Sequence, residues 1–285
     1  MSNIESLWKD YNTYEQSISL LVAKKMIDDK NKEFINARRA TKELEIFQRT
    51  LLKNNPAVPP LGSADERKQL EAWRKYIEWE KTNSLRIEDK LLLTKRVIFA
   101  YEQCLLVMGH HPELWYEAAQ YLVRTAREVA DAGDMNGGKK LGDDAADLYR
   151  RATSILMKNN PLIHFAYANF EEGRGKTEKC HVIYKKLTDL PELDPTLTFI
   201  QYMRFARRCE GIKSARQVFR LAREDGRIKF HVFVAAAWME YYSAKDKTLA
   251  IKIFELGLKR FSDKPEYVRQ YMDFMSNMND DNNTR

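Results

Sequence analysis

The sequence contains little proline or glycine and no long apolar run. Eight Pro and 11 Gly among 285 residues leave long stretches rich in Ala, Leu, Lys, Glu and Arg, a composition that favours helix over sheet. No window approaches the roughly 18 consecutive apolar residues of a membrane span. The N-terminal MSNIESLWKDYN also lacks the basic and apolar regions of a signal peptide. We therefore expect an all-α, soluble, intracellular protein without a membrane partner.

Cysteine is scarce as well. Cys104, Cys180 and Cys209 are odd in number, widely spaced and set within apolar helical patterns. Such a pattern excludes a disulfide framework and predicts buried free thiols in a reducing compartment.

The sequence also lacks the residue patterns that catalysis and metal binding require. GRGKTEK at 173–179 ends like a phosphate-binding loop, but Phe170 stands where a further Gly is needed, and the preceding pattern is helical. None of the five His stands with Cys at zinc-finger spacing. No Ser-His-Asp or Cys-His order is recoverable either. We expect neither an enzyme nor a cofactor or metal site.

What the sequence does contain is a repeat. Segments in which an aromatic residue follows an aliphatic one recur as EIFQRTL, LYRRAT, VIYKKLT, QVFRLAR and KIFELGL, with the variant FAYEQCL. Each follows another helical stretch, and Pro and Gly mostly fall between the stretches. The last four aromatic residues are each 35 residues apart, so the unit is a helical hairpin of tetratricopeptide-like length. We call these residues the second-helix aromatics: Phe47, Tyr101, Tyr149, Tyr184, Phe219 and Phe254.

The first helix of each hairpin carries its own signature. WKDYNTYE and WRKYIEWE place Trp, Tyr and Glu at spacings of three and four, which puts all three on one helix face. We expect this face to be packed in the core, with the Glu accepting a hydrogen bond or pairing with a basic residue of the next hairpin. The complete and degraded copies together predict these repeat-core residues: Trp8, Tyr11, Glu15, Trp73, Tyr76, Glu80, Trp115, Tyr167, Glu171, Tyr202 and Glu240.

This signature resembles the half-a-TPR (HAT) repeat. Longer stretches, among them LWKDYNTYE, KRVIFAYEQCLLVMGHHPELWYEAAQYL and DPTLTFIQYMRFARRCEGIKSARQVF, resemble the large HAT subunit of cleavage stimulation factor, the Suppressor of forked type. The resemblance covers nearly the whole chain and is closest to the central and C-terminal HAT region. It implies an α-α superhelix, or solenoid, of HAT hairpins.

The same resemblance implies a function. The chain is expected to be a non-catalytic scaffold in the nuclear machinery that cleaves and polyadenylates pre-mRNA 3′ ends. Its implied partners are a second copy of itself in a homodimer through the HAT region, the other subunits of cleavage stimulation factor, and the cleavage and polyadenylation specificity factor. A HAT scaffold of splicing or ribosomal RNA processing shares the fold and stays an alternative.

The spacing of the repeats predicts the organisation of the chain. We expect one HAT-repeat domain over 1–285, with about six hairpins and an incomplete last unit. Three prolines and a glycine mark 54–66 as a Pro-rich connector, and 131–144 is predicted to be a Gly-rich loop. The last predicted helix lacks a partner helix within the chain, which makes Tyr271 and Phe274 candidates for self-association.

Positive charge is concentrated in one segment. Residues 201–229 carry nine basic and three acidic side chains, a net +6 of the chain's +7. A solvated helix face with local ion pairs is the favoured interpretation. The alternative is a basic stripe that binds RNA, a weaker partner prediction. The candidate stripe residues are Arg204, Arg207, Arg208, Arg216, Arg220 and Arg223.

Overall fold

The computed structural model describes residues 4–278. All regular secondary structure in this range is helical, which confirms the predicted all-α class. None of the described helices is long and apolar enough to cross a membrane. The chain divides into two compact units, Met1–Ala152 and Thr153–Arg285, where the sequence predicted one domain.

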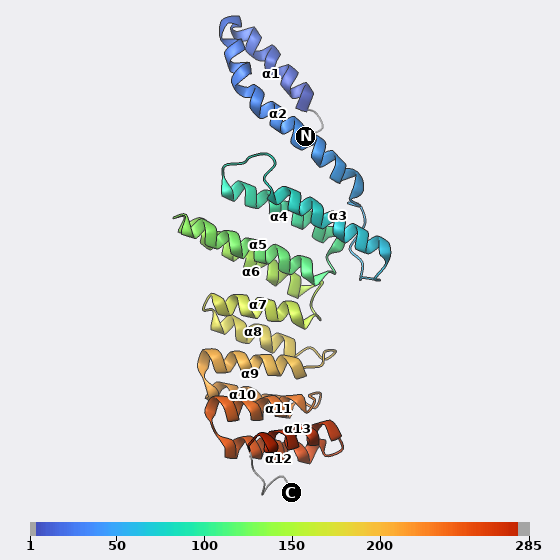
Figure 1. Ribbon diagram of the computed structural model, residues 1–285, viewed down its shortest axis with the longest axis vertical. Helices are drawn as coiled ribbons and strands as arrows, with labels where there is room; N and C mark the ends of the chain where they lie inside the picture. Colours follow the sequence, from blue (N-terminus) through green and yellow to red (C-terminus); the bar gives the residue numbers. More distant parts are fainter. Residues whose placement is uncertain (1–3, 279–285) are drawn as a thin grey trace. The chain divides into compact units, whose positions relative to one another are not determined.

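The first unit contains three helical hairpins (Figure 1). Helices α1 (Ile4–Ile18) and α2 (Leu20–Thr50) form the first and are separated only by Ser19. Helices α3 (Ala64–Lys81) and α4 (Lys90–Met108) form the second. The third consists of α5 (Pro112–Asp131) and α6 (Met135–Ser154), whose last two residues belong to the second unit.

The connector between α2 and α3 is non-helical from residue 51 to residue 63. It therefore ends three residues before the predicted limit of 54–66, because a capping box starts α3. The Ser63 hydroxyl accepts a hydrogen bond from the Glu66 backbone N–H at 3.1 Å. The Glu66 carboxylate accepts hydrogen bonds from the backbone N–H groups of Leu61 and Gly62 at 3.0 and 2.8 Å.

The predicted Gly-rich loop at 131–144 is wrong, because α6 already begins at Met135. Gly133 lies in the turn before it, with φ at +102°. Gly138 lies inside α6 against α5, where a Cβ atom would come within 2.7 Å of the Ala126 carbonyl oxygen. Glycine here lets two helices approach closely rather than ending one.

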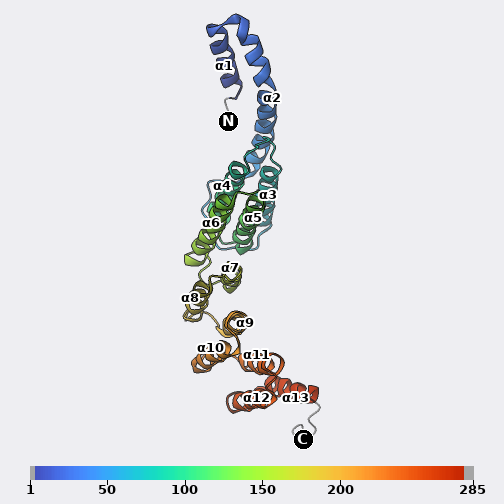
Figure 2. The ribbon, with the colours of Figure 1, turned by 90° about the vertical axis from the view of Figure 1, so that its left-hand side faces the viewer.

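The second unit contains α7 (Pro161–Gly173), α8 (Thr177–Thr188), α9 (Thr196–Glu210), α10 (Ile212–Glu224), α11 (His231–Met239), α12 (Lys247–Phe261) and α13 (Pro265–Asn277). A π-helical turn, η1 (Glu240–Ala244), continues α11. Within this unit α7, α9, α11 and α13 lie in one row, and α8, α10 and α12 lie in a second (Figure 2). Pro161 and Pro265 occupy the first turns of their helices, where the missing N–H of Pro interrupts no helical hydrogen bond.

The core of each unit is built from the second-helix aromatics. Tyr101, Tyr149, Tyr184, Phe219 and Phe254 are at most 8 % exposed and point inward, whereas Phe47 is only partly buried. Tyr184 on α8 stacks on Tyr202 of α9, the first helix of the next hairpin, with ring centroids 5.0 Å apart. Each hairpin of the second unit is thereby fixed to the following one by buried apolar surface.

The one glycine in the interior of α12 has a packing role. Gly257 is buried, and a Cβ atom there would lie 2.0 Å from the hydroxyl oxygen of Tyr267 on α13. Tyr267 is fully buried and donates a hydrogen bond to the Phe254 carbonyl oxygen at 2.9 Å, so it cannot move aside cheaply. We expect Gly257→Ala to lower the free energy of unfolding by about 1–3 kcal/mol in a urea titration.

A matched control is available in α6. A Cβ atom at Gly142 would meet nothing within 4 Å. Gly142→Ala should therefore raise the free energy of unfolding by about 0.5–1 kcal/mol through helix propensity alone. Equal effects of the two substitutions would show that the contact between Gly257 and Tyr267 does not constrain the packing.

Candidate functional site

The repeat motif of the second hairpin forms a buried polar network. The Tyr76 hydroxyl donates a hydrogen bond to Glu80 Oε1 at 3.0 Å. Arg96 on α4 donates to both oxygens of the same carboxylate, with Nη2 3.1 Å from Oε1. Glu80 is only 4 % exposed, and burial together with the Glu80 charge raises the pKa of Tyr76. The network joins α3 to α4 and leaves no charge unpaired.

The second unit repeats this pairing with different geometry. Glu171 on α7 is fully buried, and its Oε1 lies 3.5 Å from the Lys179 ammonium on α8. Glu240, 3 % exposed, receives both hydrogen bonds of the Arg216 guanidinium on α10 at 2.8 Å. The cation therefore comes from the same hairpin or the preceding one. Of the two expected roles of the Glu, the hydrogen bond is found at Glu80, which accepts one from Tyr76, whereas none of these three cations comes from the next hairpin.

The first hairpin departs from the predicted core. Trp8 stacks on Phe34 of α2 with ring centroids 4.5 Å apart, and partial desolvation together with the carboxylate of Glu15 raises the pKa of Tyr11. Yet no residue of α1 is buried, and Trp8, Tyr11 and Glu15 are all partly exposed. The prediction of buried core is wrong for these three, because α1 packs chiefly against α2 alone.

The other predicted core residues are buried as expected. The Trp115 indole donates a hydrogen bond to the Gly109 carbonyl oxygen at 2.8 Å. The Tyr202 hydroxyl lies 2.8 Å from His181 Nδ1, and burial raises the pKa of Tyr202 to about 12. Trp73 and Tyr167 are buried as well, so these repeat-core residues have a structural role in the core.

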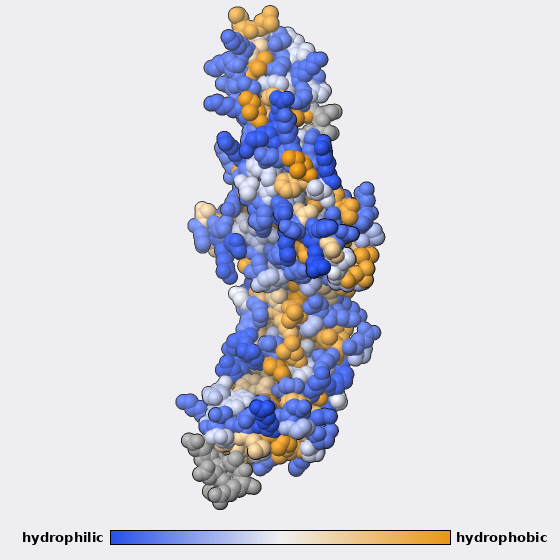
Figure 3. All heavy atoms as spheres, turned by 45° about the vertical axis from the view of Figure 1, so that its right-hand side comes forward, coloured by the Kyte–Doolittle hydropathy of each residue, from blue (hydrophilic) through white to orange (hydrophobic). Residues whose placement is uncertain are grey.

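The turn between α1 and α2 exposes apolar side chains. Ile18, Leu20, Leu21 and Val22 are 63, 79, 94 and 54 % exposed. They form the hydrophobic end of this hairpin in the surface view (Figure 3). Contiguous exposed apolar surface is typical of sites that bind other macromolecules.

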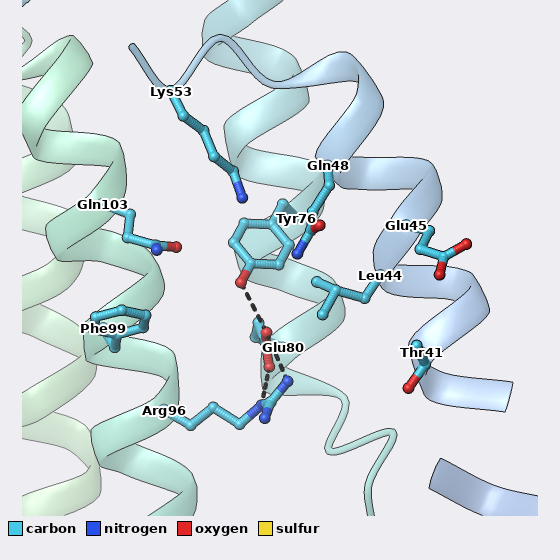
Figure 4. Close-up of a pocket in the computed structure, with 10 residues that line it drawn as sticks. All are labelled: Thr41, Leu44, Glu45, Gln48, Lys53, Tyr76, Glu80, Arg96, Phe99 and Gln103. Atoms are coloured by element: carbon cyan, nitrogen blue, oxygen red, sulfur yellow. Dashed lines mark hydrogen bonds and ion pairs between the residues drawn. The ribbon is translucent and has the colours of Figure 1, made fainter. Parts of the chain in front are cut away.

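A groove of about 330 Å³ opens between α2 and α4, above the motif residues of α3 (Figure 4). Lys53 and Gln48 point into it from one side and Gln103 from the other, while Glu80 and Arg96 form its floor. The sequence did not indicate this site, because its walls come from segments about 50 residues apart. We call it the α2–α4 groove; it is lined by Thr41, Leu44, Glu45, Gln48, Lys53, Tyr76, Glu80, Arg96, Phe99 and Gln103.

The second unit contains a larger groove, of about 590 Å³, along its row of first helices. Its walls carry apolar side chains together with charges of both signs. We call it the α9–α13 groove; it is lined by Ile200, Phe230, His231, Val234, Ala235, Glu266, Arg269, Gln270 and Asp273.

The predicted self-association residues on α13 are not a free surface. Phe274 is fully buried and contacts Trp238 and Phe254, with ring centroids 5.0 and 4.7 Å apart. Tyr271 stacks on Phe254 at 4.8 Å and is half-buried. The prediction that Phe274 is available to a second copy is wrong, because α13 packs on both α11 and α12.

The basic stripe is divided by internal ion pairs. The Arg208 guanidinium binds the Glu172 carboxylate through two hydrogen bonds of 2.8 Å, Arg216 binds Glu240, and Arg223 lies over the Phe219 ring. Arg204, Arg207 and Arg220 are exposed and have no ion-pair partner among the described residues. The stripe therefore offers three of its six arginines to a ligand without disturbing the fold.

The thiols follow the sequence prediction only in part. Cys104 and Cys180 are buried, and burial raises the pKa of both thiols to about 12. Cys209 is exposed instead, at the solvent-facing end of α9.

The buried Glu80 network yields a stability prediction. We expect Glu80→Gln to lower the free energy of unfolding by about 3 kcal/mol, because the variant leaves Arg96 partly buried without its counter-charge. Glu15 occupies the same motif position but is half-exposed, so Glu15→Gln should cost less than about 1 kcal/mol. Urea titration of both variants tests this, and a cost at Glu80 no larger than at Glu15 would contradict it.

Sequence comparison relates the chain to known proteins. The family model described as Suppressor of forked protein (Suf) matches residues 1–285. Protein suppressor of forked of Drosophila melanogaster is 47 % identical over 99 % of this chain and 41 % of its own length. Cleavage stimulation factor subunit 77 of Arabidopsis thaliana is 34 % identical, over 99 % of this chain and 36 % of its own length.

A third relative is the mRNA 3′-end-processing protein RNA14 of Cryptococcus neoformans, which is 32 % identical over the whole of this chain and 32 % of its own length. The chain thus spans between a third and two fifths of the relatives that it matches. Since the family model covers every residue, the chain belongs to the Suppressor of forked protein family.

Proposed function

We propose that the chain is a non-catalytic scaffold of pre-mRNA 3′-end cleavage and polyadenylation, acting in the nucleus. The observation that carries this proposal is the family match over all 285 residues, together with relatives named for cleavage stimulation and mRNA 3′-end processing. The exposed apolar turn at Leu20 and Leu21 supports a role in binding other proteins. The proposed partners are the other subunits of cleavage stimulation factor and the cleavage and polyadenylation specificity factor.

Self-association is the interaction that we assign to this part of the protein. The α9–α13 groove supports it better than Phe274 does, because the groove is open while Phe274 is buried. Its apolar walls are flanked by Arg269 and by the carboxylates of Glu266 and Asp273. A two-fold interface brings one surface patch against its own copy, so a patch with both signs can complement itself.

The dimer can be tested by sedimentation velocity at micromolar concentration. We expect the wild-type chain to sediment as a dimer and Arg269→Glu to weaken association by about tenfold, because the reversed charge would face carboxylates of the second copy. Arg269 is exposed and has no ion-pair partner among the described residues, so the substitution should leave folding intact.

Arg220→Glu is the matched control for this experiment. It reverses an equally exposed charge on α10, outside the groove, and should leave the dimer unchanged. A monomeric wild-type chain, or equal weakening by both substitutions, would remove the assignment of the dimer to this groove.

RNA binding is the second candidate function, favoured by the three unpaired arginines Arg204, Arg207 and Arg220. Three phosphate contacts to single-stranded RNA would weaken binding by about 20-fold between 50 and 200 mM salt. Arg220→Glu should reduce that salt dependence, whereas Arg216→Glu would also break the buried pair with Glu240 and is no clean probe. Fluorescence anisotropy with a labelled oligouridylate measures both, and binding that does not change with salt would exclude this use of the stripe.

A further inference from the structure

The α2–α4 groove is lined by two cations, Lys53 and Arg96, and by two carboxylates, Glu45 and Glu80. Its buried Glu80 is neutralised by Arg96, and the Glu45 carboxylate points away from the cavity (Figure 4). The Lys53 ammonium points into the cavity and has no ion-pair partner among the described residues. An anionic group that enters the groove would therefore meet the Lys53 ammonium as its one cation without an ion-pair partner among the described residues.

The walls of the groove combine amide and apolar groups. Gln48 on α2 and Gln103 on α4 extend into it from opposite sides (Figure 4). Each amide offers both donors and an acceptor, the combination that pairs with a peptide main chain. Phe99 beside Gln103 is 62 % exposed, and Leu44 on the facing wall is half-exposed, so an apolar side chain can also be covered there.

We propose that the α2–α4 groove binds an extended acidic peptide segment of a partner protein. One carboxylate of the peptide binds Lys53, its main chain lies between Gln48 and Gln103, and a neighbouring apolar side chain packs on Phe99. A single cation suits one carboxylate better than the repeated phosphates of RNA, which need a row of basic side chains. The inference rests on the proposed scaffold role, since it names the chemistry of one partner.

The next groove in the same unit supplies an internal comparison. It lies between α4 and α6 and is lined by Glu102, Asp144 and Asp147, with Lys95 and Arg151. Glu102 binds Arg151 and Asp147 binds Arg150, so Asp144 and Lys95 are the lining charges for which no ion pair is found among the described residues. The two grooves occupy equivalent positions in successive hairpins, and the α4–α6 groove has no counterpart of the Gln48 and Gln103 amides.

The test uses the 1–285 chain and a pool of fluorescein-labelled peptides of about nine residues, each with two Glu among Leu, Phe, Ser and Gly. Anisotropy should show binding below about 1 mM. Lys53→Gln should weaken it by about tenfold, because it removes the charge and keeps a polar, unbranched side chain. Lys53→Arg should restore binding, and Lys42→Gln, on the exposed side of α2, should have no effect.

A second peptide pool, with Gln in place of Glu, separates the electrostatic contribution from nonspecific binding. This pool should bind more weakly, and Lys53→Gln should not change its affinity. The proposal is overturned by no binding of the Glu pool at about 1 mM, by equal effects at Lys53 and Lys42, or by an oligouridylate that displaces the peptides through Lys53. Sedimentation of the same samples is independent of these outcomes, so failure here is distinguishable from failure of the proposed dimer.

Discussion

Burial of an aromatic side chain from the second helix of every hairpin after the first is the interaction on which the fold depends. In the second unit, Tyr184, Phe219 and Phe254 also contact an aromatic ring of the following first helix. A buried ring of this kind removes about 150–250 Å² from water, which at about 25 cal/mol per Å² stabilises each junction by about 4–6 kcal/mol before entropy is counted. Within the second unit, neighbouring hairpins are therefore coupled, and each one depends on the next for a complete core.

Buried carboxylates give the hairpins a defined register. Glu80, Glu171 and Glu240 are almost inaccessible, and each is neutralised by a Lys or Arg from another helix. Such a pair gains little net free energy over apolar packing, but a misplaced helix would leave a charge buried without its partner. The cost of misalignment is thus larger than the gain of pairing. Arg216 pairs with the buried Glu240, so it is not available to an RNA-binding stripe.

Exposed apolar surface and grooves occur where a hairpin is not packed against a neighbouring helix. The α1–α2 hairpin shows the motif without its burial, since Trp8 has one aromatic neighbour on α2 and solvent on its other side. The grooves arise where side chains of successive helices do not fill the space between them, and their charge depends on which ion pairs the walls already satisfy. Lys53 is free and Arg151 is not, although both line grooves of the same unit.

Several features could be predicted from the sequence and others could not. The helical class, the hairpin period and the inward aromatics follow from spacing, because a fixed interval on a helix fixes a shared face. The helix at Met135–Ser154 was missed, because glycine lowers helix propensity locally while packing of Gly138 on α5 outweighs it. The burial of Phe274 was also missed, because the repeat period along the sequence does not reveal that α13 packs on both α11 and α12.

The sequence by itself determined the repeat, its family and the identity of the buried motif residues after the first hairpin, because these depend on the order of residue types along single helices. Only the tertiary structure decided which cation neutralises each buried Glu, which arginines stay free and where the grooves open. Those outcomes depend on distances between side chains from different helices, and no interval along the chain specifies them.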